Sequence, residues 1–275
     1  MQKHRIRYRP SCPRCGTRKL WALASGRRRC ARCRYTFSVS VGGLFQQPAT
    51  VIKILHDFLD RRNTKALLER YPGLSKRTIL RIMQQARIAM TCDIDRRKFS
   101  GIVEVDETYM GGAWKNKRLS AKRTQPKSKR GRGTTKQPIF GILCRKGQVF
   151  AQLIEHVRRQ DLQPIIQRKV RRGSTVCSDT FKGYTGIAAK GYVHRLVDHS
   201  KQEYSDCKGN HINGLEGFWG YLKRQLASKG GIRRDKLRWF LGEFVWRYNH
   251  RHQSVHDQTA HLFPLIVNMK RGVIY

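Results

Sequence analysis

Acidic side chains are scarce in this sequence. Only 18 of its 275 residues are Asp or Glu, against 58 Lys or Arg, which gives a formal net charge of +40. A charge this large destabilises a compact fold through self-repulsion, so a polyanionic partner is its natural explanation. The composition therefore favours nucleic acid as the partner.

Long hydrophobic runs are also missing. No apolar stretch approaches the roughly 18 residues of a membrane-spanning helix, and no signal-peptide core follows Met1. A membrane surface would also attract basic residues, but these two absences make it the less favoured partner. We therefore expect a soluble, intracellular protein. Its 39% of apolar residues are enough for one sizeable core and small accessory modules.

The eight cysteines do not form a disulfide framework, because four are scattered and four form two C-x2-C pairs. The paired residues are Cys12, Cys15, Cys30 and Cys33. Four thiolates at this spacing can close a tetrahedral structural zinc site, and alternating side chains at 19–23 and 35–39 predict short strands on either side of the second pair. Four unrelated buried cysteines are the alternative, but a segment this short and basic has no core without a metal ion. The sequence predicts a zinc ribbon.

The segment after the ribbon carries the apolar spacing of helices. Pro48 can open a first helix, and Asn63 or Thr64 can cap a second. Ser75 can cap a third helix over residues 76–90, and together they make a helix-turn-helix pattern. A plain helical bundle with solvated charges is the alternative. The basic residues expected on the exposed face of the third helix, suited to DNA phosphates, are Lys76, Arg77, Arg81 and Arg87.

The apolar pattern changes again at GIVEVDETYM, residues 101–110, which alternates as a strand. Two further strands form a hairpin that turns at Lys146 and Gly147. An amphipathic helix, a strand, a short helix near 184–189, another strand and a final helix follow. The order β-β-β-α-β-α-β-α predicts an α/β domain with a ribonuclease-H-like mixed sheet flanked by helices.

A long basic connection separates the first two of these strands. Residues 113–136 contain no acid and are dense in Lys and Arg, including Lys129 and Arg130. We expect a flexible loop that orders only on a polyanion, and we assign these two side chains to DNA binding.

Three carboxylates are placed to meet at one edge of the predicted sheet. We expect Asp106 at the end of the first strand and Asp179 at the end of the fourth, which is its neighbour in such a sheet. Glu216 follows Asp179 with 36 residues between them, on the final helix. Carboxylates brought together repel unless cations lie between them, and hard oxygen ligands suit Mg²⁺ or Mn²⁺. Two such ions about 3.5–4 Å apart would clamp the oxygens of an in-line phosphoryl displacement.

The segments VDETY, CSDTFKGY, GNHINGLEGFWGYLKRQL and WRYNHR resemble DDE transposases of bacterial insertion sequences, in the group with an N-terminal zinc ribbon and helix-turn-helix. The resemblance covers nearly the whole chain, and its D…D-x36-E-x6-K spacing is more specific than any single motif. It implies a ribonuclease-H-like fold, a divalent metal, and DNA strand cleavage followed by transfer of a 3′-hydroxyl to target DNA. Asp106, Asp179 and Glu216 match the three acids, and Lys223 matches the trailing lysine.

The third acidic ligand has an alternative. Some relatives use Asn there, and Asn213 lies one turn before Glu216 on nearly the same face of the helix. We favour Glu216, because its charge helps to hold a second cation and the seven-residue step aligns it with Lys223.

Other polar and aromatic residues lie near these motifs. Glu104 and Glu107 flank Asp106, but strand alternation sends Glu107 to the opposite face, and His211 is a further candidate for contact with phosphate or metal. The aromatic residues expected in the core are Phe218, Trp219, Trp239, Phe240, Phe244 and Trp246. His250, His252 and His256 show no metal-binding spacing, so we expect them at the surface or near DNA.

These patterns divide the chain into a zinc ribbon (1–45), a helix-turn-helix domain (46–95) and a catalytic domain (96–275). The predicted protein is a cytoplasmic, nucleoid-associated bacterial transposase that binds double-stranded DNA as a homodimer or larger assembly. It would carry a structural Zn²⁺ and two catalytic Mg²⁺ or Mn²⁺ ions. The alternatives are a non-catalytic DNA-binding regulator, which has no use for three converging carboxylates, and a ribonuclease-H-like nuclease that cuts without joining.

Overall fold

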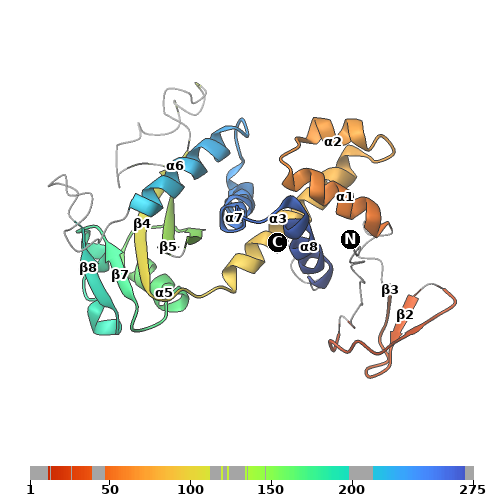
Figure 1. The fold of residues 1–275 in the computed structure, drawn as a ribbon, viewed down its shortest axis with the longest axis horizontal. Helices are drawn as coiled ribbons and strands as arrows, with labels where there is room; N and C mark the ends of the chain where they lie inside the picture. The colour runs from red at the N-terminus through yellow and green to blue at the C-terminus, as the bar shows by residue number, and fades with distance from the viewer. Residues whose placement is uncertain are drawn as a thin grey trace. The chain divides into compact units, whose positions relative to one another are not determined.

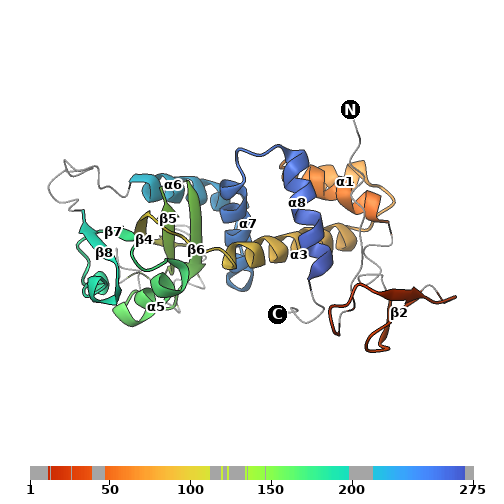
Figure 2. The same cartoon turned by 60° about the horizontal axis from the view of Figure 1, so that its bottom comes forward.

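A computed structural model of the chain describes residues 12, 14–25, 27–38, 47–111, 136–145, 147–197 and 213–269, together with 119, 123 and 134. The chain forms two compact units. One contains Met1–Asp93 and His250–Tyr275, and the other contains Ile94–Asn249. Figures 1 and 2 show the ribbon from two directions.

A small antiparallel sheet lies between and after the two cysteine pairs. Its strands are β1 (Leu20–Ala22), β2 (Arg27–Cys30) and β3 (Thr36–Ser38), in the order β1-β2-β3. The outer strands lie where alternation predicts them. The sequence does not predict the central strand, because RRRC has no alternation of apolar and polar residues.

The same unit contains α1 (Pro48–Leu59), α2 (Thr64–Arg70), most of α3 (Lys76–Asp95) and α8 (Val255–Asn268). Each of the first three begins as predicted. Pro48 lies in the first turn of α1, the Asn63 side chain accepts from the Ala66 N–H at 2.9 Å, and Ser75 Oγ accepts from the Thr78 N–H at 3.1 Å. α3 continues beyond the predicted end at residue 90.

α8 packs against α1, so a C-terminal segment joins the N-terminal helices in one unit. The apolar residues at helical spacing form its core, and those buried on these two helices are Val51, Ile54, Leu55, Phe58, Leu59, Leu262, Phe263 and Ile266. Within the described residues, no helix is long and apolar enough to span a membrane.

The second unit is built on a five-stranded mixed sheet in the order β6-β5-β4-β7-β8. Its strands are β4 (Ile102–Met110), β5 (Gln137–Cys144), β6 (Gln148–Leu153), β7 (Thr175–Ser178) and β8 (Val193–Leu196). β4, β5 and β6 form an antiparallel meander, whereas β7 and β8 run parallel to β4. This topology confirms the predicted ribonuclease-H-like α/β class.

Helices cover both faces of this sheet: α5 (Arg159–Lys169), α6 (Asn213–Ala227) and α7 (Leu237–Asn249) (Figures 1 and 2). Asp106 and Gly141 are register partners on the face towards α6. The next residues along these strands, Glu107, Phe140 and Gln152, are register partners on the opposite face. There Gln152 on β6 accepts a hydrogen bond from Arg168 of α5. Alternation along β4 therefore separates an α6 face from an α5 face.

The segment between β7 and β8 differs from its prediction. Instead of one short helix near 184–189, it forms two 3₁₀ turns, η3 (Lys182–Tyr184) and η4 (Ala188–Lys190). Gly186 lies between them with φ of +81°, a left-handed conformation that no helix continues through.

Candidate active site

Two neighbouring strands bring Asp106 and Asp179 together. Asp106 lies in the middle of β4, not at the strand end expected from the sequence, because β4 continues to Met110. β4 and β7 run in parallel, with Glu104 opposite Cys177. Continuing that register by two residues sets Asp106 opposite Asp179, which follows the last residue of β7. Asp179 Oδ1 also accepts a hydrogen bond from the Phe181 N–H at 3.1 Å, so the carboxylate is oriented by the turn that follows it.

α6 brings Glu216 to the same place. Burial raises the pKa of Asp106 to about 6, and the negative charges of Asp179 and Glu216 contribute to that rise. The Glu107 backbone N–H and the Trp219 indole act in the opposite direction, lowering that pKa. The charges of Asp179 and Glu216 therefore lie within electrostatic reach of Asp106 in the folded chain.

Glu104 holds the start of α6 against the sheet. Its carboxylate is fully buried, and Oε2 accepts a hydrogen bond from the Leu215 N–H at 2.9 Å. Negative charge at the first turn of a helix satisfies an otherwise unpaired N–H and suits the helix dipole. Glu104 is thus committed to positioning the turn that carries Glu216, which argues against a metal-binding role for it.

Trp219 holds Asp106. Its indole Nε1 donates a hydrogen bond of 2.9 Å to Asp106 Oδ2, and its ring lies over Gly141 of β5. A Cβ at Gly141 would come within 2.5 Å of the ring, so the glycine makes room for the indole. From the sequence, Trp219 is expected only as a core residue. The available signals were a glycine inside a strand and a tryptophan one turn after Glu216.

The opposite face of β4 behaves as alternation predicts. Glu107 points away from α6, towards the fully buried Tyr184. Burial raises the pKa of Tyr184 well above its usual value, and the charges of Glu107, Asp106 and Asp179 add to that effect. Tyr184 is therefore a neutral phenol beneath the acidic residues.

The donor set fits a divalent cation with oxygen ligands. Among the described residues, the groups of three or more ligands whose atoms all lie within 4.8 Å of one another are the four cysteines and a cluster of Asp93, His250 and His261. The three carboxylates are spread more widely than that. Such a spread suits two ions, because ligands shared between ions about 3.5–4 Å apart need not surround one point.

Asn213 and Lys223 are both exposed on α6, Asn213 at its first residue and Lys223 two turns after Glu216. Their proposed roles stay predictions, as does the choice between Asn213 and Glu216. His211 lies outside the described residues.

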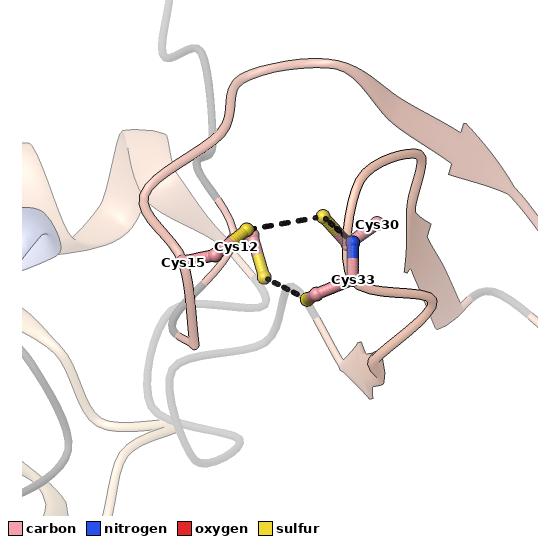
Figure 3. A group of neighbouring side chains, drawn as sticks. All are labelled: Cys12, Cys15, Cys30 and Cys33. Atoms are coloured by element: carbon pink, nitrogen blue, oxygen red, sulfur yellow. Dashed lines mark hydrogen bonds between the residues drawn. The ribbon is translucent and has the colours of Figure 1, made fainter.

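The four cysteines of the ribbon are close together (Figure 3). Sγ of Cys12 lies 3.5 Å from that of Cys33, and Sγ of Cys15 lies 3.4 Å from that of Cys30. In a tetrahedral site with Zn–S bonds of about 2.3 Å, neighbouring sulfurs are separated by about 3.8 Å. The cluster therefore fits zinc with little adjustment.

The predicted DNA-binding residues have different outcomes. Lys76, Arg77 and Arg81 are exposed on the first turns of α3. Lys129, Arg130 and nearly all of the loop 113–136 lie outside the described residues. The exposure predicted for Arg87 is wrong: it is buried, and its guanidinium lies 5.4 Å from the centre of the Phe58 ring. Helical rotation turns it away from Arg81 and towards α1.

The aromatic and histidine predictions also divide. Phe218, Trp219, Trp239, Phe244 and Trp246 are buried as expected, while Phe240 is half-buried. His252 and His256 are exposed, but the surface position predicted for His250 is wrong. It is only 3% exposed, and its ring centre lies 5.2 Å from that of His261 on α8.

Known proteins share much of this sequence. The family model of the ISXO2-like transposase domain matches residues 98–249, more than half of the chain. An uncharacterized transposase-like protein of Haemophilus influenzae is 32% identical over 121 residues, which cover 44% of this chain and 95% of that protein. An uncharacterized protein in the transposable element ISH50 of Halobacterium salinarum is 25% identical over 252 residues, 86% of this chain and 84% of that protein.

Two solved structures show a more distant likeness. The catalytic core domain of BIV integrase is 14% identical and covers 56% of this chain and 86% of its own, with a TM-score of 0.35. The Mos1 transposase paired-end complex with the left transposon end is 13% identical and covers 79% of each chain, with a TM-score of 0.27. The domain match, by contrast, spans the whole sheet with α5, α6 and α7. The chain therefore belongs to the family of ISXO2-like transposases and is a DNA transposase, as the sequence resemblance predicts.

Proposed function

We propose that this transposase cuts DNA at the ends of its element and joins the 3′-hydroxyl to target DNA at Asp106, Asp179 and Glu216. The observations that support the assignment are the strand register, which sets Asp106 of β4 opposite Asp179, and the charges of Asp179 and Glu216, which add to the burial that raises the pKa of Asp106. A half-buried carboxyl near other carboxylates favours the bound form of a divalent cation, because the cation relieves their repulsion.

The three residues would hold two Mg²⁺ or Mn²⁺ ions. When bound, such ions supply charge stabilisation for the attacking and leaving oxygens of an in-line displacement at phosphorus. The protein's own part is to keep the ligands in place. Trp219 fixes one oxygen of Asp106, and Glu104 anchors the turn before Glu216. Lys223, exposed two turns after Glu216, would bind a phosphate of the DNA.

The N-terminal residues would bind the terminal repeats. A ribbon closed by Zn²⁺ on Cys12, Cys15, Cys30 and Cys33 has no open position, so we assign it a structural role. Lys76, Arg77 and Arg81 lie exposed where a recognition helix would meet phosphates, and we keep Lys129 and Arg130 as further DNA-binding residues. We also propose the division into a ribbon (1–45), a helix-turn-helix (46–95) and a catalytic domain (96–275), whose last helix, α8, packs against α1 of the helix-turn-helix. The protein would act at the nucleoid as a homodimer or larger assembly.

The test is a pair of substitutions on α6, assayed for cleavage and joining with end-labelled element DNA and Mg²⁺. Glu216→Gln should abolish both steps and leave folding and end binding nearly intact, because it removes a ligand and also removes repulsion. Asn213→Ala is the matched control, one turn earlier on the same face, and should retain activity. If Asn213→Ala abolishes cleavage while Glu216→Gln keeps it, Asn213 is the third ligand.

The same assay distinguishes the alternative functions. A ribonuclease-H-like nuclease would release cut ends and form no joined product, whereas a regulator would bind the ends without cutting. Joined products from the unchanged protein, lost in Glu216→Gln, would support the transposase assignment over both.

A further inference from the structure

A second group of metal-type ligands lies outside the catalytic residues and the ribbon. Asp93 near the end of α3, His250 directly after α7 and His261 on α8 bring their ligand atoms within 4.8 Å of one another. All three belong to the compact unit formed by residues 1–93 and 250–275. They are contributed by three separate segments, so no local spacing in the sequence reveals them.

The geometry is close to that of a coordination shell. His261 Nε2 lies 3.3 Å from Asp93 Oδ2, and the rings of His250 and His261 have centres 5.2 Å apart. Ligand atoms at about 2.0–2.1 Å from a tetrahedral zinc ion are separated by about 3.4 Å. One pair already has this separation, and the third ligand atom lies within 4.8 Å of both.

The surroundings hold the two histidines in place. The side chain of Gln258 donates hydrogen bonds to the carbonyl oxygens of His250 and Gln253, at 3.1 and 3.0 Å, which fixes the turn before α8. Ser254 Oγ caps α8 by accepting from the Asp257 N–H at 3.1 Å. The spacing between His250 and His261 is thus set by a braced turn and a capped helix.

The burial of the three residues also suits a bound ion. His250 is 3% exposed, whereas the side chains of Asp93 and His261 are 14% and 42% exposed. An ion held there would have protein on one side and an open path for entry, with a position left for water. An ordinary exposed ion pair between His261 and Asp93 would not require a buried histidine beside it.

We propose that Asp93, His250 and His261 bind a divalent transition-metal ion, of which zinc is the best fit. Two imidazoles and one carboxylate are typical zinc ligands, and imidazole disfavours Mg²⁺ and Ca²⁺. The ion would join α3, through Asp93, to α8, through His261. Asp93 and His250 are the residues at which the chain leaves and re-enters the unit formed by residues 1–93 and 250–275. Its role is structural, and it does not depend on the chemistry proposed for the carboxylates.

The test measures bound zinc in the full-length protein after removal of metal by a chelator and equilibrium dialysis against Zn²⁺ with excess Mg²⁺, which occupies the proposed carboxylate site. We expect two zinc ions per chain in the unchanged protein, one at the cysteines and one at the new site. His261→Gln should lose one of them, with zinc affinity at this site reduced at least about 100-fold, because even outer-shell changes cost 10–100-fold. His256→Gln is the matched control, an exposed histidine on the same helix, and should keep both.

Cobalt distinguishes the two sites directly. Co²⁺ bound by thiolates gives an intense charge-transfer absorption, so His261→Gln should leave this band unchanged while total bound Co²⁺ falls by one ion per chain. Asp93→Asn, which keeps the size of the side chain, should weaken the same site. The proposal is overturned if the unchanged protein and His261→Gln bind equal amounts of metal, or if His256→Gln loses as much as His261→Gln.

Discussion

The ribbon and the three carboxylates are two ways of building the metal centres that we propose. In the ribbon, all four ligands lie within one short segment, and Cys12 and Cys33 are 21 residues apart. In the catalytic domain, the proposed ligands come from β4, the residue after β7, and α6, and Asp106 accepts a hydrogen bond from a side chain 113 residues away. The cysteines meet wherever their own loops fold, whereas the carboxylates meet only if the sheet forms and α6 is anchored upon it.

This difference determines how each site affects the free energy of folding. A four-thiolate site supplies folding free energy to a segment with little apolar core, since its buried cluster is Cys12 and Cys30 with Cys15, Leu20 and Cys33 around it. The carboxylates do the reverse, because the partial burial of Asp106 and the repulsion from Asp179 and Glu216 cost free energy that the core around them must offset. Removing a ligand should therefore lower the stability of the ribbon and raise the stability of the metal-free catalytic domain.

The largest effect should follow Cys30→Ser in the ribbon. Apparent zinc-binding free energies of small structural sites are about 10–16 kcal/mol, so losing one thiolate should unfold the ribbon. We expect loss of one zinc ion by metal analysis and weaker end-specific DNA binding, while the catalytic sheet keeps its circular dichroism and cooperative unfolding.

Cys92→Ser is the matched control for that experiment. Cys92 lies on α3, outside the four-cysteine cluster, and its replacement should keep both the metal and the end binding. Full zinc content in Cys30→Ser would contradict the four-thiolate site.

Asp106→Asn tests the opposite behaviour. The folded pKa of Asp106 is about 6, above its ordinary 3.8, so the folded metal-free protein binds a proton that the unfolded chain releases. Protonated Asp106 therefore stabilises the folded protein at low pH. This contribution, on the order of 3 kcal/mol of unfolding free energy, is lost as the pH rises from about 4 to about 6. The introduced asparagine does not titrate, so above this pH window Asp106→Asn should have an unfolding free energy higher than that of the unchanged protein by the same amount.

Urea unfolding with a chelator, at pH values on either side of this window, measures the effect. Added Mg²⁺ should stabilise the unchanged protein at the higher pH and leave Asp106→Asn unaffected, while cleavage by Asp106→Asn falls to background. If the difference in stability between the two proteins is the same at both pH values, the carboxylate is not strained as described.

The same contrast explains how much the sequence predicts. C-x2-C spacing, helix caps at Asn63 and Ser75, and alternation along β4 are local, and the structure bears them out. The strand order follows from the order of elements. Contacts between distant segments cannot be predicted from the sequence, because tertiary packing alone decides which segments meet. Examples are the contacts of Glu104 with Leu215, Trp219 with Asp106, and His250 with His261.

A smaller effect should follow Gly141→Ala, which tests the scaffold of the carboxylates. A Cβ there would come within 2.5 Å of the Trp219 ring, so the indole must shift, at a cost of about 1–3 kcal/mol in unfolding free energy. Asp106 would lose its donor, and cleavage should fall by about 10-fold if some 1.4 kcal/mol of ligand positioning is lost. Thermal unfolding and single-turnover cleavage measure the two effects.

Gly217→Ala is the control for the added methyl group. It lies on α6, and a Cβ added there would meet no atom within 4 Å, so the unfolding free energy should hold or rise slightly. Trp219→Phe, which keeps a ring but removes the N–H donor, should reproduce the loss of cleavage with less loss of stability. Normal cleavage by both Gly141→Ala and Trp219→Phe would show that the indole does not position Asp106.

The smallest effect concerns Arg81 and Arg87 on α3, which the sequence places on one basic face and the structure separates. Arg81 is exposed, so Arg81→Ala should leave the free energy of unfolding within about 0.5 kcal/mol. If Arg81 contacts a phosphate, the slope of log affinity against log salt for end DNA should become shallower by about 0.9. Arg87 is buried against the Phe58 ring, so Arg87→Ala should lower stability through lost packing and leave the slope unchanged. Fluorescence anisotropy over a salt series, with urea unfolding of both variants, separates the two, and an unchanged slope in Arg81→Ala would remove Arg81 from the DNA interface.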